Sequence, residues 1–257
     1  ILCFHKFNLN NIIDYMKLII DVGNTNIKIG IFKDDEILKK IRFNNEKKID
    51  LTSIFLDFPN INQVLFCGKK RKLKQQINNI INKKNVNLIE WDDIQKDMID
   101  INYEVKELGF DRLGVSVGAI YLYPKFNNHL IIDIGSCITY DLILNKKYKG
   151  GQISPGINIR LKSLSCFTTS LPNLQFLKPE KMLGDSTKNS IQSGVFFGVN
   201  DEIKARIEFY KKEITELNVI LTGGDAFHFK NRIKNVFFDD DLLMKGLNLL
   251  LNYNVEK

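Results

Sequence analysis

Residues that bind metals or form disulfide bonds are scarce in this sequence, which has four cysteines and three histidines among 257 residues. They are Cys3, Cys67, Cys137, Cys166, His5, His129 and His228. None of them forms the closely spaced pairs that disulfide frameworks and Cys/His zinc sites require. We therefore expect neither kind of site.

Long apolar runs are missing as well. A membrane-spanning helix needs about 18 or more consecutive apolar residues, and the sequence contains no such run. Residues 1–15 lack the apolar stretch and the small-residue cleavage site of a secretion signal, so we expect a cytoplasmic protein without a membrane partner. Nothing before Met16 forms a recognisable pattern, and we interpret residues 1–15 as an extension outside the fold, either disordered or not native.

The chain is basic, with a formal net charge of +7 and a pI near 9.0, but the signals of nucleic-acid binding are absent. Lysines such as Lys69, Lys70, Lys72 and Lys74 have the spacing of a solvated helix face. A nucleic-acid surface usually adds interleaved aromatic residues or a recognisable binding module. We therefore interpret these lysines as surface residues and predict no nucleic-acid partner.

What the sequence does contain is a repeat. The segment Leu18–Gly23, LIIDVG, returns as Leu130–Gly135, LIIDIG. A buried strand that ends in an acid and a glycine, followed by a polar turn and a second apolar run, brings a carboxylate and backbone N–H groups to the end of a sheet. Two such segments indicate duplicated halves with a phosphate and its metal held between them.

Apolar periodicity and turn residues outline the elements of each half. In the first half we expect strands at 17–22, 27–32, 36–43, 63–67 and 87–91, a helix at 69–83, and a helical stripe from about Gly109 to Pro124. In the second half we expect strands at 130–134, 137–144, 147–152, 218–222 and 235–238, and helices at 157–167, 186–213 and 241–253. This order predicts an α/β fold with a mixed sheet and flanking helices in each half. We place the two lobes at residues 16–127 and 128–257, with a cleft between them.

The first repeat continues into a turn with the groups that phosphoryl transfer needs. Asp21-Val-Gly-Asn24-Thr25-Asn-Ile-Lys28 combines a carboxylate, a flexible glycine, short polar side chains and a lysine. Backbone N–H groups can bind phosphate oxygens, a lysine opposes their charge, and an acid holds Mg²⁺ directly or through water. The same residues are good turn formers, so an ordinary hairpin turn is the alternative.

Six further short motifs follow this turn in order. They are Gly109-Phe-Asp111-Arg112, Asp133-Ile-Gly-Ser136-Cys-Ile-Thr-Tyr-Asp141, Gly150-Gly-Gln-Ile-Ser-Pro155-Gly156, Thr168-Thr-Ser-Leu-Pro172, Gly184-Asp-Ser-Thr187 and Thr222-Gly-Gly224-Asp225. Each is weak by itself. In this order, together with the first turn, they resemble the signature of type III pantothenate kinases over nearly the whole chain from Met16 onward.

The resemblance implies a duplicated actin-like, ribonuclease H-like fold of the acetate and sugar kinase superfamily. It also implies ATP-dependent phosphorylation of the primary hydroxyl of pantothenate to 4'-phosphopantothenate, which is the first step of coenzyme A biosynthesis. The family uses Mg²⁺ and a monovalent cation, K⁺ or NH₄⁺, and works as a homodimer.

Carried over position by position, the resemblance assigns residues to ATP and to cations. The ATP-binding residues would be Asp21, Val22, Gly23, Asn24, Thr25, Asn26, Ile27, Lys28, Ser136, Gly223 and Gly224. Asp21 would lie near Mg²⁺, and Asp133 would bind the monovalent cation. Ser136 stands where the family usually has threonine, and it keeps the hydroxyl that contacts ATP. For the two glycines, a plain strand-to-helix turn is the alternative.

The resemblance assigns the catalytic base to Asp111. The substrate-binding residues would be Tyr103, Gly109, Phe110, Asp111, Arg112 and Thr187. A primary alcohol is not ionised at neutral pH, so a carboxylate must orient it and accept its proton during attack on the γ-phosphorus. Two alternatives stay open: Asp111 as an acid that interacts with a helix dipole, and Thr187 as part of a helix N-cap with Ser186.

Two further positions are ambiguous. Asp141, on the strand after the second turn, either supports the site or is a structural acid. Tyr103 stands eight residues before Asp111, one fewer than the family's spacing, and Val105 or Lys106 replaces the family's proline. A changed loop at this point would affect pantothenate affinity before it affected the chemistry.

Two rival functions remain. A related actin-like kinase could phosphorylate another hydroxylated substrate, because the phosphate-binding machinery does not choose the acceptor. A non-catalytic regulatory protein could also retain the fold. In such a protein the acidic and basic residues needed for catalysis could be substituted without loss of function. This chain retains all of the following: Asp21, Lys28, Asp111, Arg112 and Asp133.

Overall fold

The structure is a computed structural model, and it describes residues 15–44, 49–82, 84 and 86–255. All but the last residue of the predicted extension, residues 1–15, lies outside this range. The described residues divide into two compact units between Asp93 and Ile94, and each unit is described by itself. This division falls earlier than the lobe boundary expected at 127/128, because the helix that begins at Phe110 packs against the last helix of the chain.

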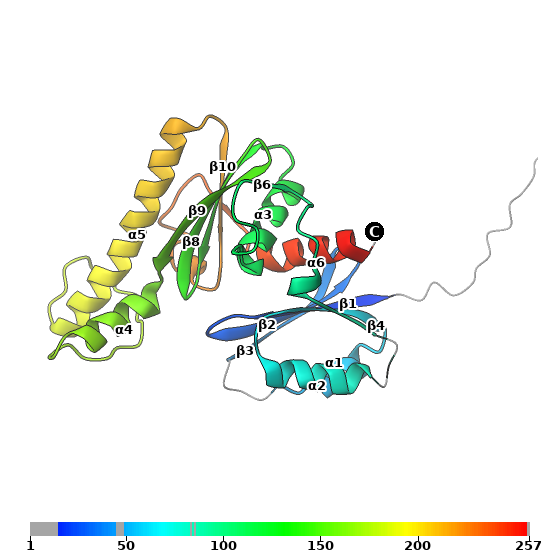
Figure 1. The fold of residues 1–257 in the computed structure, drawn as a ribbon. Coiled ribbons are helices and arrows are strands. Elements are labelled where there is room, and N and C mark those ends of the chain that lie inside the picture. Colours follow the sequence, from blue (N-terminus) through cyan, green and yellow to red (C-terminus); the bar gives the residue numbers. More distant parts are fainter. Residues whose placement is uncertain (1–14, 45–48, 83, 85, 256–257) are drawn as a thin grey trace, which may run out of the picture. The chain divides into compact units, whose positions relative to one another are not determined.

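The first unit contains a five-stranded mixed sheet (Figure 1). Its strands are β1 (Met16–Val22), β2 (Asn26–Lys33), β3 (Glu36–Asn44), β4 (Ile61–Cys67) and β5 (Asn87–Glu90), and its helices are α1 (Leu51–Asp57), α2 (Arg71–Ile81) and the short 3₁₀ helix η1 (Trp91–Asp93). The order across the sheet is β3-β2-β1-β4-β5. β1, β2 and β3 form an antiparallel meander, and β4 and β5 continue the sheet in parallel with β1. The predicted strands and the predicted helix are confirmed.

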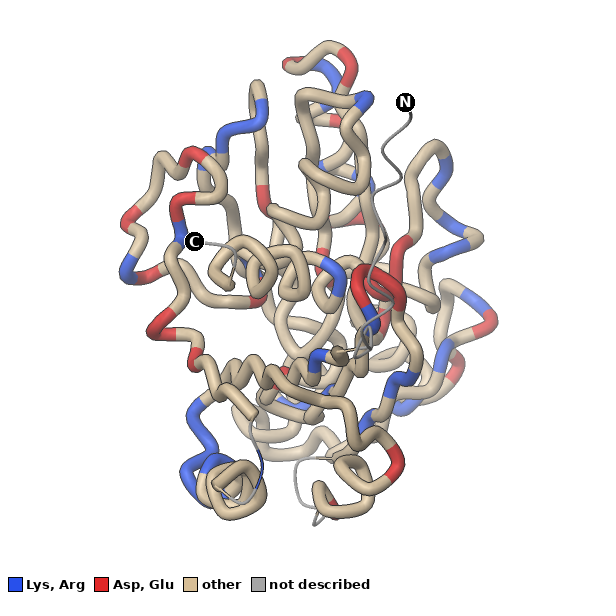
Figure 2. Tube along the Cα trace, turned by 90° about the vertical axis from the view of Figure 1, so that its right-hand side faces the viewer, with Lys and Arg blue, Asp and Glu red and all other residues tan. Residues whose placement is uncertain are grey.

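Helices α1 and α2 cover one face of this sheet. Leu73, Ile77 and Ile81 of α2 recur at helical spacing and are buried in the same core as Leu18 and Ile20 of β1. The lysines of α2 lie off this apolar stripe. Figure 2 shows basic and acidic residues along much of the trace, with several basic residues close together at its lower left. Lys69 and Lys72 are exposed, as expected of surface residues.

Helix α1 is an element that the sequence analysis missed. Only Leu51, Ile54 and Phe55 of its seven residues are buried, so its apolar pattern is too short to stand out from that of a strand or loop. Its start is nevertheless encoded locally, because the Asp50 side chain caps the helix by accepting from the backbone N–H of Ser53 at 3.2 Å.

The second unit repeats this topology. Its strands are β6 (Asp100–Ile101), β7 (Asn128–Ile134), β8 (Cys137–Leu144), β9 (Lys147–Pro155), β10 (Leu217–Thr222) and β11 (Phe237–Phe238). Its helices are α3 (Phe110–Leu122), α4 (Ile157–Phe167), α5 (Thr187–Glu213), the short η2 (Ala226–His228) and α6 (Leu242–Val255). The sheet order is β11-β10-β7-β8-β9-β6. Except for the added β6, it matches the first sheet strand for strand, with β7 in the place of β1, which confirms the duplication.

The two faces of the second sheet carry different helices. Successive residues of a strand point to opposite faces, and Tyr140 and Asp141 of β8 show where each face leads. The Tyr140 hydroxyl donates to Glu202 of α5 at 2.8 Å, whereas Asp141 accepts from Arg112 of α3 at 2.8 Å. Helices α4 and α5 therefore cover one face and share its core, and α3 lies with α6 on the other (Figure 1).

Small residues set the close packing of α3 on α6. A Cβ atom added at Gly246 would lie 1.8 Å from the carbonyl oxygen of Gly114, and one added at Gly118 would lie 2.8 Å from that of Leu242. This contact ties α3 to the second unit. In the described ranges, every helix is too short or too polar to span a membrane.

Candidate active site

The turn of the first repeat joins β1 to β2, and a buried acid precedes it. The antiparallel register pairs Asp21 with Lys28, and the Lys28 Nζ lies 3.9 Å from an Asp21 carboxylate oxygen. Asp21 is 4% exposed, while Asn24 and Thr25 at the tip are exposed. The Gly23 N–H donates to the Asn26 carbonyl at 3.0 Å. The carboxylate, the glycine, the short polar side chains and the lysine thus lie together on a tight hairpin turn. This geometry is compatible with a phosphate-binding turn and with an ordinary hairpin turn.

A glycine follows β4 in the first unit and β10 in the second, and each packs on the end of the corresponding strand, β1 or β7. Gly68, after β4, has φ +145°, and a Cβ atom there would lie 2.4 Å from the Cβ of Val22. Gly223, after β10, has φ +98°, and its Cβ would lie 2.2 Å from an Asp133 carboxylate oxygen. Neither position accepts a side chain without strain. Gly68 was missed because a lone glycine after a strand gives no signal distinct from a turn.

The second turn, between β7 and β8, is enclosed by two backbone segments. Asp133 is partly buried and faces Gly223. From the other side the Gly156 N–H donates to the Ser136 carbonyl at 3.0 Å, and its Cα is so close to the Gly135 carbonyl oxygen that a Cβ would lie 2.0 Å from it. The structure therefore brings together Asp133, Ser136 and Gly223, three of the residues predicted to hold ATP and a cation.

Helix α3 begins with the predicted base. Gly109 is the N-cap with extended backbone, and Asp111 lies in the first turn. The Asp111 Oδ1 accepts from the backbone N–H of Arg112 at 2.9 Å, and a Cβ atom at Gly109 would lie 2.5 Å from this oxygen. Asp111 is exposed. It occupies the helix N-terminus, as the structural alternative expects, and its exposure also leaves it accessible to a substrate hydroxyl.

The next residue, Arg112, points into the unit instead. Its side chain is 7% exposed, and its Nε donates to the Asp141 Oδ1 at 2.8 Å. The guanidinium carbon lies 5.4 Å from the ring centre of Tyr103 and 5.8 Å from that of Tyr148, within the range of cation–π attraction. Burial disfavours the charge on Arg112, but the Asp141 carboxylate outweighs this and raises the pKa of the guanidinium. Tyr103 thus reaches Arg112 despite the altered spacing of its loop.

Asp141 is the residue that the sequence left undecided. It is fully buried and accepts two further hydrogen bonds, from the Tyr148 hydroxyl at 2.8 Å and from the Thr139 hydroxyl at 3.0 Å. Its role as the ionic partner of Arg112 was not predicted, and neither were the roles of Thr139 and Tyr148. The sequence signal was an acid at an inward position of an otherwise apolar strand.

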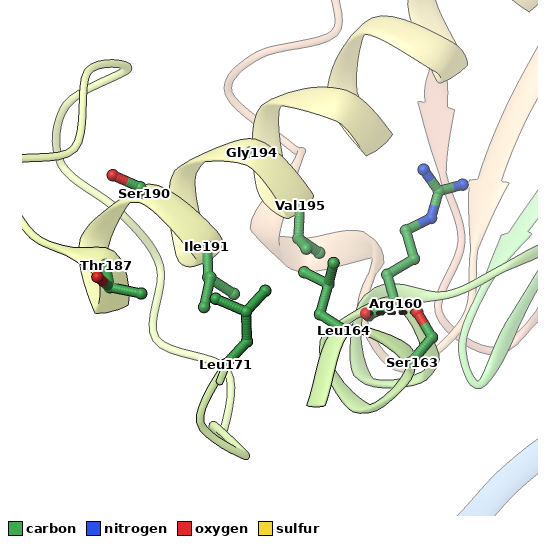
Figure 3. A pocket seen from close by; sticks show the side chains of 9 residues that line it. All are labelled: Arg160, Ser163, Leu164, Leu171, Thr187, Ser190, Ile191, Gly194 and Val195. Atoms are coloured by element: carbon green, nitrogen blue, oxygen red, sulfur yellow. Dashed lines mark hydrogen bonds between the residues drawn. The ribbon is translucent and has the colours of Figure 1, made fainter. Parts of the chain in front are cut away.

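Thr187 lies elsewhere in the second unit, at a pocket of about 630 Å³ between α4 and α5 (Figure 3). The pocket is lined by Arg160, Ser163, Leu164, Leu171, Thr187, Ser190, Ile191, Gly194 and Val195. The capping hydroxyl belongs to Ser186, which accepts from the Asn189 N–H at 3.3 Å. The structure brings Thr187 to Leu171, from the motif 168–172, and neither Asp111 nor Arg112 lines this pocket.

A cation site in the described residues would use fewer than three His, Cys, Asp or Glu side chains. No three or more His, Cys, Asp or Glu side chains in these ranges are grouped closely enough to form a metal centre. Kinase sites commonly hold Mg²⁺ with one or two carboxylates, water and the phosphates of the nucleotide. Asp21, at the end of β1 beside Asn24 and Thr25, suits that arrangement.

Comparison with known proteins identifies the family. The sequence profile of the type III pantothenate kinases matches residues 17–208. The type III pantothenate kinase of Cytophaga hutchinsonii is 35% identical over 260 residues, which cover 93% of this chain and 100% of that protein. The chain belongs to the type III pantothenate kinase family. The Flavobacterium johnsoniae member is 36% identical over 94% of this chain and 99% of its own length.

Solved structures agree on the fold. A Campylobacter jejuni protein described as a Baf family transcriptional activator has a TM-score of 0.58 and 24% identity, and it covers 93% of this chain and 100% of its own. Component A of the Acidaminococcus fermentans (R)-2-hydroxyglutaryl-CoA dehydratase has a TM-score of 0.52 and 14% identity, with coverage of 94% and 98%. At these identities the likeness concerns the fold alone, and it accords with the duplicated actin-like α/β architecture expected for the type III pantothenate kinase family.

Proposed function

We propose that this protein transfers the γ-phosphoryl group of ATP to the primary hydroxyl of pantothenate and so forms 4'-phosphopantothenate, the first intermediate of coenzyme A biosynthesis. The observation that carries the proposal is the start of α3, where an exposed carboxylate, Asp111, stands next to Arg112, which is buried and charged. Membership of the type III pantothenate kinase family supplies the substrate. The cytoplasm, where coenzyme A synthesis uses ATP, is the location that fits this activity.

In this proposal Asp111 is the general base. Its Oδ1 is held by the Arg112 backbone N–H, so the carboxylate is fixed in direction at the helix N-terminus. The Oδ2 accepts the proton of the pantothenate hydroxyl as the oxygen attacks the γ-phosphorus. The transition state of phosphoryl transfer is loose in most analyses, so orientation of the hydroxyl contributes more than proton removal.

The first unit supplies the phosphate-binding turn. Lys28 opposes the negative charge of the phosphates, and the exposed Asn24 and Thr25 offer short polar contacts. Asp21 would hold Mg²⁺ through water or directly. Bound Mg²⁺ neutralises the charge of the transferring group and of the leaving ADP.

The second unit supplies the monovalent-cation site. Asp133 would bind K⁺ or NH₄⁺, and the absence of a side chain at Gly223 lets its backbone approach this carboxylate closely. Ser136 would contact ATP from the same turn. The functional reason for glycine at position 223 is then the close approach of backbone and cation.

A homodimer is the assembly that we propose. The second unit exposes large apolar side chains on β9, on α4 and on the segment before α5. They are Ile153, Ile159, Phe167, Leu177, Met182 and Leu183, with exposed fractions from 41% to 88%. Scattered exposed apolar residues are normal, but a group of this size is typical of an interface. The same segments lead into Thr187, which we assign to pantothenate binding.

The test is ADP formation by the purified protein with ATP, Mg²⁺ and K⁺, with and without pantothenate. We expect turnover that depends on pantothenate. Turnover with a different alcohol and none with pantothenate would favour the related-kinase alternative, and no turnover with any acceptor would favour the regulatory one. A parallel series in Na⁺ checks the cation assignment, because K⁺ should lower the KM for ATP.

A further inference from the structure

The guanidinium of Arg112 is secured at one end. Its Nε donates to Asp141, whereas Nη2 is buried and has no hydrogen-bond partner among the described residues. Nη2 lies against Gly151, where an added Cβ atom would be 2.7 Å from it. A buried charged N–H without an acceptor is costly. The arrangement is therefore that of a donor positioned for an oxygen that the protein itself does not supply.

The acid that holds Arg112 is not required by the fold. In the second sheet Asp141 pairs with Ile131, and in the first sheet the residue that pairs with the corresponding Ile19 is Gly30. The first unit thus completes the same strand meander with no side chain at this place. A buried ion pair is often no more stabilising than apolar residues of similar volume, so the fold by itself gives no reason for a charged pair at Asp141 and Arg112.

Two neighbouring side chains keep the Asp141 carboxylate in one orientation. The Tyr148 hydroxyl, from β9, donates to the same Oδ1 that accepts from Arg112, and the Thr139 hydroxyl donates to Oδ2. Thr139 corresponds in register to Lys28 of the first unit, since Thr139 pairs with Asp133 as Lys28 pairs with Asp21. The two halves have diverged here, from a phosphate-binding cation to a support for Asp141.

We propose that Asp141, together with Tyr148 and Thr139, is a positioning residue for the pantothenate kinase reaction. It fixes the Arg112 guanidinium so that its Nη end, covered by the ring of Tyr103, meets an oxygen of the acceptor substrate. The proposal rests on the function proposed above. It assigns to this group an effect on the binding of the acceptor and none on the binding of ATP.

The matched test compares two tyrosines. Tyr148→Phe removes one hydrogen bond to Asp141 and leaves the ring in place. Tyr140→Phe is the control, because Tyr140 is equally buried on the neighbouring strand and also donates to a carboxylate at 2.8 Å, but that carboxylate is Glu202 on the opposite face of the sheet. Both variants should lose similar stability.

We expect Tyr148→Phe to raise the KM for pantothenate about five- to tenfold. This is less than the effect of losing a hydrogen bond to a charged group directly, which exceeds about tenfold, because Tyr148 acts on the substrate only through Asp141 and Arg112. The kcat should change less than about twofold and the KM for ATP should stay unchanged. Tyr140→Phe should leave all three constants near their wild-type values. Asp141→Asn should raise the KM for pantothenate more than Tyr148→Phe does, because asparagine can keep the hydrogen bonds to Arg112 and Thr139 but loses the charge.

Equal pantothenate KM values in wild type, Tyr148→Phe and Tyr140→Phe would overturn the inference and leave Asp141 a structural acid. A parallel rise in the KM for ATP would overturn it as well. If Asp141→Asn does not fold, the two tyrosine variants decide the matter. If the wild-type protein shows no pantothenate-dependent turnover, the proposed function and this inference are both refuted. That result differs from an active wild type whose variants keep the same KM for pantothenate, which refutes this inference alone.

Discussion

Gly223→Ala is expected to damage both stability and the monovalent-cation site. The backbone at this position has φ +98°, and an added Cβ atom would lie 2.2 Å from the Asp133 carboxylate oxygen and 2.5 Å from the Ile134 carbonyl oxygen. Both distances are well below van der Waals contact, so either the carboxylate or the turn must move. If Asp133 binds K⁺, the cation site is distorted by the same displacement.

The magnitude separates into two parts. A non-glycine residue at positive φ costs about 1–2 kcal/mol, and the forced repacking adds about 1–3 kcal/mol, so the free energy of unfolding should fall by about 2–5 kcal/mol. Gly150→Ala is the matched control. Gly150 has φ +113°, but its added Cβ would meet its nearest atom, on Tyr103, at an ordinary 3.5 Å, so this variant should show the backbone cost alone.

Denaturant unfolding measures the stability of both variants, and initial rates over a K⁺ series measure the cation response. Gly223→Ala should lose more stability than Gly150→Ala and should need at least about tenfold more K⁺ for half-maximal rate, the effect of about 1.4 kcal/mol at the cation site. Equal stability loss in the two variants would refute the clash. An unchanged K⁺ response in Gly223→Ala would refute the assignment of the cation to Asp133.

Three further outcomes are expected. The variant Asp111→Asn keeps the Oδ1 acceptor for the Arg112 backbone N–H. It should lower kcat at least about tenfold, while the affinity for ATP, measured by titration, should persist. An unchanged kcat would show that Asp111 is not the base. Burial lowers the pKa of His129 to about 4. Between pH 6.5 and 4 the imidazole is therefore protonated in the unfolded chain but neutral in the folded protein. The free energy of unfolding should fall by about 3 kcal/mol as the pH drops through this window. Unfolding curves at several pH values check this, and His129→Asn should flatten the dependence. Ser186→Ala should cost about 1 kcal/mol of stability with little effect on the KM for pantothenate, whereas Thr187→Val should do the reverse; a rise in KM for the serine variant alone would exchange the two roles.

The duplicated halves carry different residues opposite the same acid. The corresponding strands β1 and β7 each carry an acid one residue before their last, and a positive-φ glycine follows β4 and β10. The first turn pairs its acid with Lys28, while the second has Thr139 at the corresponding place. The fold places a carboxylate at the same point in both units, and the residue that pairs with it differs.

Much of the fold followed from local patterns. The meanders of both units, the long helix α5 and the order of strands are encoded in periodicity and turn residues that lie within a few positions of one another. The candidate residues Asp21, Lys28, Asp111 and Asp133 were found in the same way, because each belongs to a short motif next to a strand end or a helix start. Helix α1 and strand β6 were missed, because a seven-residue helix and a two-residue strand carry too little pattern.

The sequence by itself determined the family, the repeat and the residues that bear charge, because these depend on residue type and order along the chain. Only the tertiary structure decided how some of them act. Arg112, near the start of α3, and Asp141, on β8, are separated by the rest of α3 and the whole of β7, and Tyr148 lies on β9. Their hydrogen bonds exist because α3 packs on the face of the sheet to which Asp141 points, and no local pattern encodes which face a distant helix will cover.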